Sequence, residues 1–360
     1  MQIVCVVGTR PNIVKMAPVI AALRRRFPEW CVATVHTGQH YDRLMSDVFL
    51  EELDMPDPDH VLGVGSGTHA EQIARVLERL QPVLVEEQPD LVLVPGDVNS
   101  TLGAALCAEK MGAAVGHVES GLRSFDRSMP EETNRIATDH LSALCFLHSD
   151  EAIENLQAEG VGEKRMKFVG NTMIDSLVAL EGLIRERGTA ASLGLEPGSY
   201  VLVTLHRPAL VDGPLLADAM QALSTVGSEL PVMFPVHPRT RKNMGGRDYH
   251  GVRLTDPVGY LDFLSLESEA AAVLTDSGGI QEETTYLGIP CFTLRDNTER
   301  PVTIRAGTNT LLGLDPGRIT EIPDLLRGRA AATDGANKPQ RPELWDGRAA
   351  ERVAEVLADW

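Results

Sequence analysis

The sequence predicts an α/β fold made of two Rossmann-like, doubly wound domains that face a cleft. Short apolar runs alternate with helical patterns along most of the 360 residues, and strands that alternate with helices indicate parallel sheets with helical crossovers. A chain of this length also exceeds the size at which a single hydrophobic core stops growing. We therefore expect domains over residues 1–170 and 171–343, with a final helix within 344–360 that packs back across their junction.

The first series of elements begins at the N-terminus. Six apolar runs predict buried strands, at residues 2–7, 31–36, 90–94, 113–118, 144–148 and 166–169. Helical patterns lie between several of these strands, at residues 11–26, 68–87, 100–111 and 131–142. This alternation predicts a parallel sheet with crossover helices in the first domain.

The second series follows the polar stretch Glu196-Pro197-Gly198. Its apolar runs predict strands at residues 199–204, 231–236, 252–254, 271–275 and 291–294. The strand that ends at residue 275 leads into a short helical pattern from Ile280 to Leu287, which Gly288 closes before Pro290. The second domain is therefore also expected to contain a parallel sheet.

Composition limits the partners and the compartment. The formal charge is −18, with 51 acidic against 33 basic residues, which argues against a nucleic-acid or anionic-membrane partner. No run of about 18 apolar residues is present to span a bilayer. The N-terminus opens with a strand instead of a basic leader and a long apolar run, so we expect no signal peptide. The five cysteines lie mostly in apolar patterns and indicate reduced core residues of a cytoplasmic protein: Cys5, Cys31, Cys107, Cys145 and Cys291.

The motifs of common metal and cofactor sites are missing. The histidines show no HxxxH or HExxH spacing and the cysteines form no CxxC pair, which argues against a zinc site. No GxGxxG follows the first strand, which argues against a dinucleotide site in the first domain. We therefore expect neither a metal nor a cofactor.

A glycine-containing turn joins the strand that ends at residue 275 to the next helix. Ser277, Gly278 and Gly279 stand where backbone N–H groups and the positive end of a helix dipole point at one spot, which suits a phosphate. The two glycines allow close approach of an oxygen, and Ser277 adds a hydroxyl donor. Glu283, about one turn further on, is placed to reach a pair of sugar hydroxyls. An ordinary strand-to-helix turn is the alternative.

Other polar residues also follow predicted strands. Ligands of open α/β sheets bind beyond the carboxyl ends of the strands. The first domain offers Arg10, Gln39, His40, Asp97 and Glu119 at such ends, and the second offers His206, Arg207, His237 and Ser277. Two carboxyl edges that face one another would form one site in a cleft shared by both domains.

Most of these residues have a structural alternative. Arg10 would serve as a turn cap, Asp97 as a helix N-cap, and His206 and His237 as core histidines. Lys15 either faces solvent or contacts the same anion as Arg10. Glu131 and Arg135, four residues apart, would form an ordinary helix ion pair.

Eight sequence blocks resemble one family, the non-hydrolysing UDP-N-acetylglucosamine 2-epimerases of bacteria and archaea. They run in order from Val7 to Gly313 and comprise Gly8–Pro11, Thr37–His40, Pro95–Asp97, His117–Ser124, Pro130–Arg135, Val169–Asp175, Asp276–Glu283 and Thr298–Pro301. The resemblance implies a GT-B-like fold, a homodimer, and a UDP-sugar in the cleft between the domains. It also implies reversible interconversion of UDP-GlcNAc and UDP-ManNAc for the synthesis of surface polysaccharide.

The family reaction needs neither NAD nor a metal. UDP is eliminated to give a 2-acetamidoglucal and is added back after protonation of carbon 2 from the opposite face, which requires an acid, a base and donors for the departing diphosphate. By resemblance, the catalytic residues are Asp97, Glu119, Glu131 and His206. The substrate-binding residues are Arg10, Lys15, Arg135, His237, Phe263, Ser277, Gly278, Gly279, Glu283 and Arg300. Among these, Glu283 would hold the ribose and Phe263 the uracil, with core packing as the alternative for Phe263.

The resemblance also implies an activating site for a second UDP-GlcNAc. The matching positions are Gln39, His40, Arg75, Glu132, Arg207 and His237. The chain departs from the family pattern at Val98, at Pro208-Ala209 and at Val302, near the expected sugar site.

These departures leave the substituents of carbons 3 and 6 of the sugar open. A related diacetamido sugar is therefore one alternative substrate. A hydrolysing epimerase, a GT-B glycosyltransferase and a non-enzymatic nucleotide-sugar sensor are alternative functions. Three carboxylates and a histidine around one sugar favour the epimerase.

Overall fold

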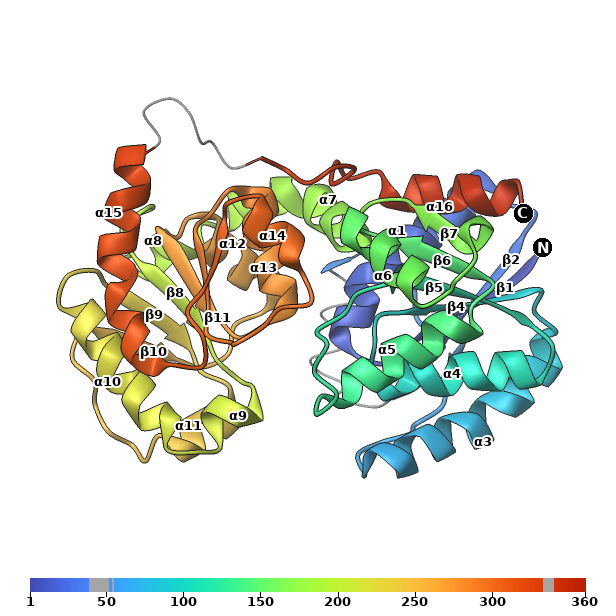
Figure 1. Cartoon of the computed structure of the whole chain (residues 1–360), viewed down its shortest axis with the longest axis horizontal. Coiled ribbons are helices and arrows are strands. Elements are labelled where there is room, and N and C mark those ends of the chain that lie inside the picture. Colours follow the sequence, from blue (N-terminus) through green and yellow to red (C-terminus); the bar gives the residue numbers. More distant parts are fainter. Residues whose placement is uncertain (39–51, 54, 333–339) are drawn as a thin grey trace. The chain divides into compact units, whose positions relative to one another are not determined.

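The computed structural model describes residues 1–38, 52–53, 55–332 and 340–360. The chain forms two compact units (Figure 1). Unit 1 comprises Met1–Ala179 and Glu343–Trp360, and unit 2 comprises Leu180–Pro342. The sequence predicted divisions at 170/171 and 343/344. The first division lies later because it falls within a continuous helix, α7 (Thr172–Arg187), and not in the loop before it.

Unit 1 contains a seven-stranded parallel sheet in the order β3-β2-β1-β4-β5-β6-β7. Its strands are β1 (Gln2–Val7), β2 (Cys31–His36), β3 (His60–Val61), β4 (Leu91–Pro95), β5 (Ala114–Ser120), β6 (Leu144–Leu147) and β7 (Met166–Phe168). The strand order reverses between β1 and β4, and ligands of doubly wound sheets bind at such a switch point. All six strands predicted for this domain are confirmed, and the two-residue β3 is additional.

Helices cover both faces of this sheet (Figure 1). They are α1 (Arg10–Arg26), α3 (His69–Glu87), α4 (Asn99–Lys110), α5 (Pro130–Leu141), α6 (Asp150–Ala158), the first part of α7, and α16 (Ala349–Ala358). A capping box in which Thr68 and Glu71 satisfy each other's backbone N–H groups starts α3. Apolar side chains of α3 and α4 pack on those of β1, β2 and β4 in one buried core.

The C-terminal segment completes unit 1. The indole N–H of Trp345, which is 2% exposed, donates to the carbonyl of His148 at 2.8 Å. Asp175 accepts two backbone N–H bonds from the first turn of α16, at 3.1 and 2.7 Å. On the surface Arg26 of α1 pairs with Glu355 of α16 at 3.1 Å. The last helix therefore belongs to the N-terminal unit.

Unit 2 contains a six-stranded parallel sheet in the order β10-β9-β8-β11-β12-β13. Its strands are β8 (Val201–Thr204), β9 (Val232–Pro235), β10 (Val252–Thr255), β11 (Ala272–Thr275), β12 (Cys291–Thr293) and β13 (Asn309–Leu311). The order again reverses, between β8 and β11, so both units are doubly wound. The predicted fold class is confirmed.

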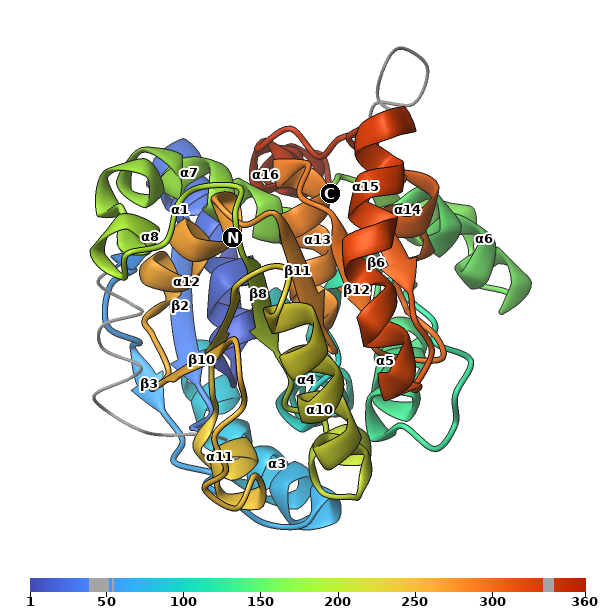
Figure 2. The same ribbon diagram turned by 90° about the vertical axis from the view of Figure 1, so that its left-hand side faces the viewer.

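The longer helices of unit 2 also cover two faces, as Figures 1 and 2 show. Its helices are α8 (Thr189–Ser192), α9 (Pro208–Val211), α10 (Leu215–Gly227), α11 (Pro238–Asn243), α12 (Tyr260–Ser268), α13 (Gly278–Leu287), α14 (Pro301–Arg305) and α15 (Ile322–Ala332). Alternate residues of β8 point to opposite faces: Val201 and Val203 pack with α10, whereas Leu202 packs with α8 and α12. No helix in the described parts of the chain is long and apolar enough to cross a bilayer.

Candidate active site

A tight turn places Asp97 at the carboxyl end of β4. Gly96 has a φ of +63°, and a Cβ atom at this position would lie 3.2 Å from the Lys15 Nζ, so glycine meets both a conformational and a packing requirement. The Asp97 Oδ2 lies 2.5 Å from the Arg135 Nη2, and Asn134 donates to the Asp97 carbonyl at 2.9 Å. The Asp97 carboxylate is therefore held from α5.

Glu119 is the last residue but one of β5 and has a backbone conformation that non-glycine residues rarely adopt. Its φ is +68°, and the pairing of β5 with β6 shifts register between Val118 and Ser120. The Glu119 Oε2 lies 2.5 Å from the Lys15 Nζ, with side-chain exposures of 4% and 8%. Backbone strain of this kind is costly and concentrates at functional sites. The structure thus joins two residues that the sequence analysis proposed separately.

The first turn of α5 contributes a second group of charges. Glu132 is buried and accepts from the Ser124 N–H and hydroxyl at 2.9 and 2.8 Å and from the Phe125 N–H at 2.9 Å. The Arg135 Nη1 lies 3.0 Å from the Glu132 Oε2. Arg135 therefore bridges Glu132 and Asp97, while Glu131 on the same turn is half-exposed. Arg10, at the start of α1, is exposed.

A buried network that the sequence analysis did not identify lies beneath these residues. Asp139 of α5 accepts from the His117 Nδ1 at 2.6 Å and from the Ser120 hydroxyl at 2.5 Å, and the Arg123 Nη1 lies 2.8 Å from its Oδ2. Burial alone raises the pKa of Asp139, but His117, Arg123 and the Ser120 hydrogen bond outweigh it and bring this pKa below the ordinary value. His117, Ser120 and Arg123 lie in the block His117–Ser124, which was a signal in the sequence, whereas Asp139 lies outside every block.

In unit 2 a buried carboxylate organises the switch point between β8 and β11. Asp276, which is 1% exposed, accepts from the backbone N–H groups of His206 and Arg207 at 2.9 and 2.7 Å. The His206 Nδ1 lies 2.9 Å from the Asp276 Oδ1, and the imidazole is 49% exposed. Burial alone raises the pKa of Asp276. The hydrogen bonds and the charge of His206 lower this pKa by more, so it lies below the ordinary value. Because Asp276 holds the Nδ1 of His206, the other ring nitrogen, Nε2, can contact a substrate.

The glycine-containing turn forms the N-terminus of α13. Ser277 is the N-cap residue and Gly278 is the first helical residue. A Cβ atom at Gly278 would collide with the guanidinium of Arg300, so glycine admits this cation to the helix N-terminus. The Arg300 Nε lies 3.0 Å from Glu282. The turn therefore combines backbone N–H groups with a buried cation, which suits an anion.

Acidic side chains crowd behind this turn. Glu283 accepts from the Tyr260 hydroxyl at 2.9 Å, and burial, reinforced by the charge of Glu282 and opposed by Tyr260, raises the pKa of Glu283 to about 7. Glu267 is fully buried, and neither of its carboxylate oxygens has a hydrogen-bond partner among the described residues. Burial and the charge of Glu283 raise the pKa of Glu267 well above its ordinary value.

Two further residues predicted to bind substrate, Phe263 and His237, have ordinary structural contacts. Phe263 is half-buried and packs against a core cluster that includes Tyr200, as the packing alternative requires. His237 is exposed and caps α11, accepting from the Arg239 N–H at 3.2 Å. The alternative of a core histidine is wrong for both His206 and His237, because both side chains are exposed.

The positions expected for a second UDP-GlcNAc are described in part. Arg75 donates to the carbonyls of Val64 and Ser66 at 3.1 and 2.8 Å, and the Arg207 Nη2 lies 3.8 Å from Glu299. Gln39 and His40 lie outside the described residues.

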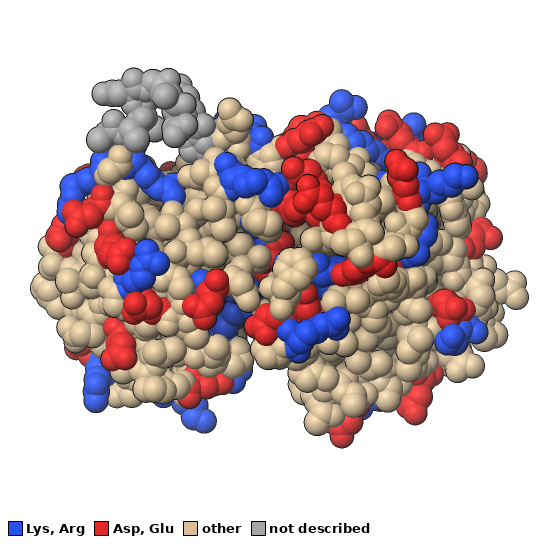
Figure 3. All heavy atoms as spheres, in the orientation of Figure 1, with Lys and Arg blue, Asp and Glu red and all other residues tan. Residues whose placement is uncertain are grey.

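Figure 3 shows acidic and basic side chains interspersed on the face of each unit that is drawn. Within residues 1–38, 52–53, 55–332 and 340–360, no group of three or more His, Cys, Asp or Glu side chains is arranged to hold a metal ion.

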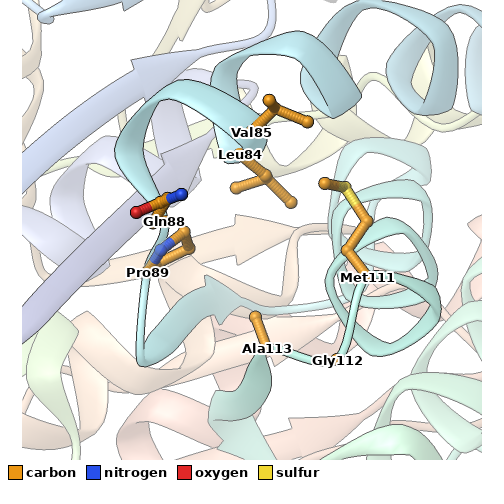
Figure 4. A pocket seen from close by; sticks show the side chains of 7 residues that line it. All are labelled: Leu84, Val85, Gln88, Pro89, Met111, Gly112 and Ala113. Atoms are coloured by element: carbon orange, nitrogen blue, oxygen red, sulfur yellow. The ribbon is translucent and has the colours of Figure 1, made fainter.

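A surface pocket of about 370 Å³ lies away from the candidate residues (Figure 4). It is lined by the last turn of α3, by Pro89 before β4, and by Met111–Ala113 before β5. These residues lead into the amino ends of β4 and β5, whereas Asp97 and Glu119 lie at the carboxyl ends of these strands. The pocket therefore does not belong to the candidate site.

Comparisons with known proteins point to one family. A family model described as UDP-N-acetylglucosamine 2-epimerase matches residues 22–358. A UDP-N-acetylglucosamine 2-epimerase of Methanococcus maripaludis is 41% identical over 328 residues, covering 87% of this chain and 88% of that protein. A UDP-2,3-diacetamido-2,3-dideoxy-D-glucuronate 2-epimerase of Pseudomonas aeruginosa is 38% identical over 367 residues, covering 99% of each. The crystal structure of Methanocaldococcus jannaschii UDP-GlcNAc 2-epimerase in complex with UDP-GlcNAc and UDP is similar over the whole of both chains, with a TM-score of 0.89 and 36% identity.

Proposed function

The chain belongs to the UDP-N-acetylglucosamine 2-epimerase family, and we propose that it reversibly inverts carbon 2 of UDP-GlcNAc to give UDP-ManNAc. No carbonyl is adjacent to carbon 2 to acidify its proton. In the proposed route a base removes that proton, the C1–O bond breaks with its electron pair leaving on UDP, and a 2-acetamidoglucal forms. Protonation of carbon 2 from the opposite face and re-addition of UDP at carbon 1 then complete the inversion, with no net gain or loss of atoms.

One observation carries this proposal: two strand-end carboxylates of unit 1, each held by a buried cation. Asp97 is paired with Arg135 and Glu119 with Lys15. Proton transfer at carbon 2 requires positioned acid and base groups. With Glu131 of α5, these carboxylates are the proposed catalytic acids and bases.

Unit 2 supplies the proposed binding groups for the nucleotide. The N-terminus of α13, with Ser277, Gly278, Gly279 and the adjoining Arg300, suits the diphosphate. The Nδ1 of His206 is held by Asp276, which frees Nε2 for the leaving diphosphate or a proton. Glu283 is proposed to accept hydrogen bonds from the ribose hydroxyls, and Phe263 is proposed to contact uracil. Arg10 and His237 are the remaining proposed binding residues. The proposal requires that both sets of residues act on the same substrate molecule.

Proton NMR of UDP-GlcNAc with the protein in deuterated water tests the proposal. We expect a mixture of UDP-GlcNAc and UDP-ManNAc, with deuterium at carbon 2 of both. Release of free N-acetylmannosamine would instead indicate a hydrolysing epimerase. Absence of both inversion and exchange would overturn the proposal.

A second candidate substrate is UDP-2,3-diacetamido-2,3-dideoxy-D-glucuronate. The Pseudomonas aeruginosa enzyme named for it is 38% identical over 99% of this chain, and the departures at Pro208-Ala209 and Val302 stand near residues proposed to bind substrate. The ratio of kcat/KM for the two UDP-sugars decides between them. We expect UDP-GlcNAc to be the better substrate.

The family resemblance extends the proposal to a homodimer and to activation by a second UDP-GlcNAc. Arg75, Glu132, Arg207 and His237 are the described residues proposed for that second site. Time courses that start from UDP-ManNAc alone test activation: a lag that added UDP-GlcNAc abolishes supports it, and an immediate linear rate contradicts it. Light scattering of the purified protein gives the oligomeric state.

A further inference from the structure

We infer that His117 and Asp139 form a positioning pair that fixes Asp97 and Glu119 in the geometry needed for proton transfer. The inference rests on the proposed epimerase function. Neither residue belongs to the proposed catalytic or binding set. Both side chains are fully buried, so they would act through the residues they hold and not by touching the sugar.

Asp139 ties the loop after Glu119 to α5. It accepts from the His117 Nδ1 and the Ser120 hydroxyl at 2.6 and 2.5 Å and from the Gly121 N–H at 3.1 Å. These donors stand on both sides of Glu119, whose own backbone has a φ of +68°. A strained residue persists only where its surroundings over-determine its conformation. Asp139 supplies those constraints.

His117 extends the same network to the turn that carries Asp97. Its Nε2 lies 2.7 Å from the carbonyl oxygen of Gly96. A carboxylate and a carbonyl oxygen only accept hydrogen bonds, so both ring nitrogens of His117 must donate. The inferred pair thus has a proton on each nitrogen of the His117 ring.

The pair also connects the ends of β4 and β5 to α5, the helix that carries Glu131. Asp139 stands eight residues after Glu131 and four after Arg135 on α5, so the three residues share one helix face. Arg135 contacts Asp97, His117 contacts the carbonyl of Gly96 before Asp97, and Asp139 holds the residues on both sides of Glu119. A misplacement of about 1 Å in such a constellation costs roughly a hundredfold in rate.

Arg123 links this network to a second carboxylate. Arg123 contacts Asp139 at 2.8 Å and forms two hydrogen bonds, at 2.7 and 2.6 Å, with Glu159. Glu159 thus shares Arg123 with Asp139, whereas the hydrogen bonds to Gly96 and Ser120 are formed by His117 and Asp139. It offers a matched control.

The test compares Asp139→Asn with Glu159→Gln. The asparagine amide would turn a donor toward the Gly121 N–H or Arg123, which are themselves donors. We expect Asp139→Asn to lower kcat for UDP-GlcNAc epimerisation by about 10- to 100-fold with KM changed less than about threefold, and Glu159→Gln to leave both near wild type. Equal losses in both variants, or a wild-type kcat in Asp139→Asn, would overturn the inference.

Two variants of His117 test its two hydrogen bonds separately, and they also replace Asp139→Asn as the test if that variant does not fold. His117→Asn retains a donor near the Nδ1 position, and His117→Gln retains one near the Nε2 position. Both are expected to lose at least about tenfold in kcat while UDP affinity, a property assigned to unit 2, is unchanged. A variant that loses UDP affinity and kcat together would indicate general unfolding and contradict a positioning role.

Nitrogen-15 NMR of the histidine rings gives a readout that does not depend on turnover. We expect both ring nitrogens of His117, assigned by the loss of its signals in His117→Gln, to carry protons. A neutral tautomer would refute the pair as described even if the enzyme epimerises. Conversely, protonated nitrogens in a protein without turnover would refute the proposed function alone.

Discussion

The two units share a strand order but place different chemistry at the same switch point. In unit 1 the carboxylates at the carboxyl ends of β4 and β5 are held by cations: Arg135 contacts Asp97, and Lys15 contacts Glu119. In unit 2 the corresponding edge has a helix N-terminus with Arg300, and the acids behind it crowd together. Glu267 and Glu283 both have a raised pKa there.

The difference shows that topology fixes where a site lies and that residue type decides what the site does. Paired carboxylates in unit 1 have the fixed orientations that proton transfer needs. Backbone N–H groups, a cation and a protonatable acid in unit 2 suit the recognition of a nucleotide. Four experiments break or sharpen this division.

The largest effect is expected from Glu119→Gln. The amide cannot exchange a proton at carbon 2 and leaves Lys15 without its carboxylate, so kcat should fall by about 10²- to 10⁴-fold. UDP affinity, measured by calorimetry, should stay at the wild-type value because unit 2 is intact. A parallel loss of UDP affinity would contradict the proposal that unit 1 carries out proton transfer and unit 2 binds the nucleotide.

A smaller effect, on binding alone, is expected from Gly278→Ala. The added methyl group displaces the Arg300 guanidinium and weakens UDP binding by about 10- to 100-fold, the value of one or two charge-assisted hydrogen bonds. Gly328→Ala is the control, because nothing lies within 4 Å of a Cβ atom at that helical glycine. Equal affinity in the two variants would remove the N-terminus of α13 from the nucleotide site.

The pH dependence of substrate binding tests Glu283. Ribose hydroxyls donate to a carboxylate, whereas the pKa of Glu283 is raised to about 7, so binding must release its proton at lower pH. We expect the affinity for UDP-GlcNAc to fall by about tenfold per unit as pH drops below this pKa. Glu283→Gln should flatten the dependence. Binding that tightens toward acid pH would contradict this role.

The smallest effect is expected on stability, from Glu267→Gln. The folded pKa of Glu267 lies above its unfolded value, so its favourable contribution exists below the unfolded pKa and is lost as pH rises through the folded pKa. The variant should therefore be more stable than wild type at mildly alkaline pH, by about 1 kcal/mol. In mildly acid conditions the difference should vanish. Urea unfolding at both pH values measures it, and a destabilised variant in alkaline buffer would contradict the burial argument.

Much of this arrangement is readable from the sequence because the strands are continuous apolar runs. Asp97 and Glu119 were placed at strand ends for that reason, and the structure has them there. The strands β3 and β13 were not predicted. β3 has only two residues, and β13 begins with the polar residues Asn309 and Thr310. A short run gives no periodic signal.

The partners within the site could not be predicted in the same way. Lys15 was assigned to solvent or an anion, and its contact with Glu119 arises because α1 and β5 are brought together by the sheet. Likewise, His117 and Asp139 are 22 residues apart, with no local pattern that links them. Tertiary contacts of this kind follow from strand order, which sequence periodicity does not encode.

The return of the chain to unit 1 has a consequence for biosynthesis. The N-terminal sheet emerges from the ribosome long before Trp345 and α16 are made, although both are part of its core. That unit therefore reaches its final state only after Leu180–Pro342 has been synthesised. Loss of residues 343–360 would therefore remove packing from the N-terminal sheet, although these residues are far from it in the sequence, and would leave unit 2 whole.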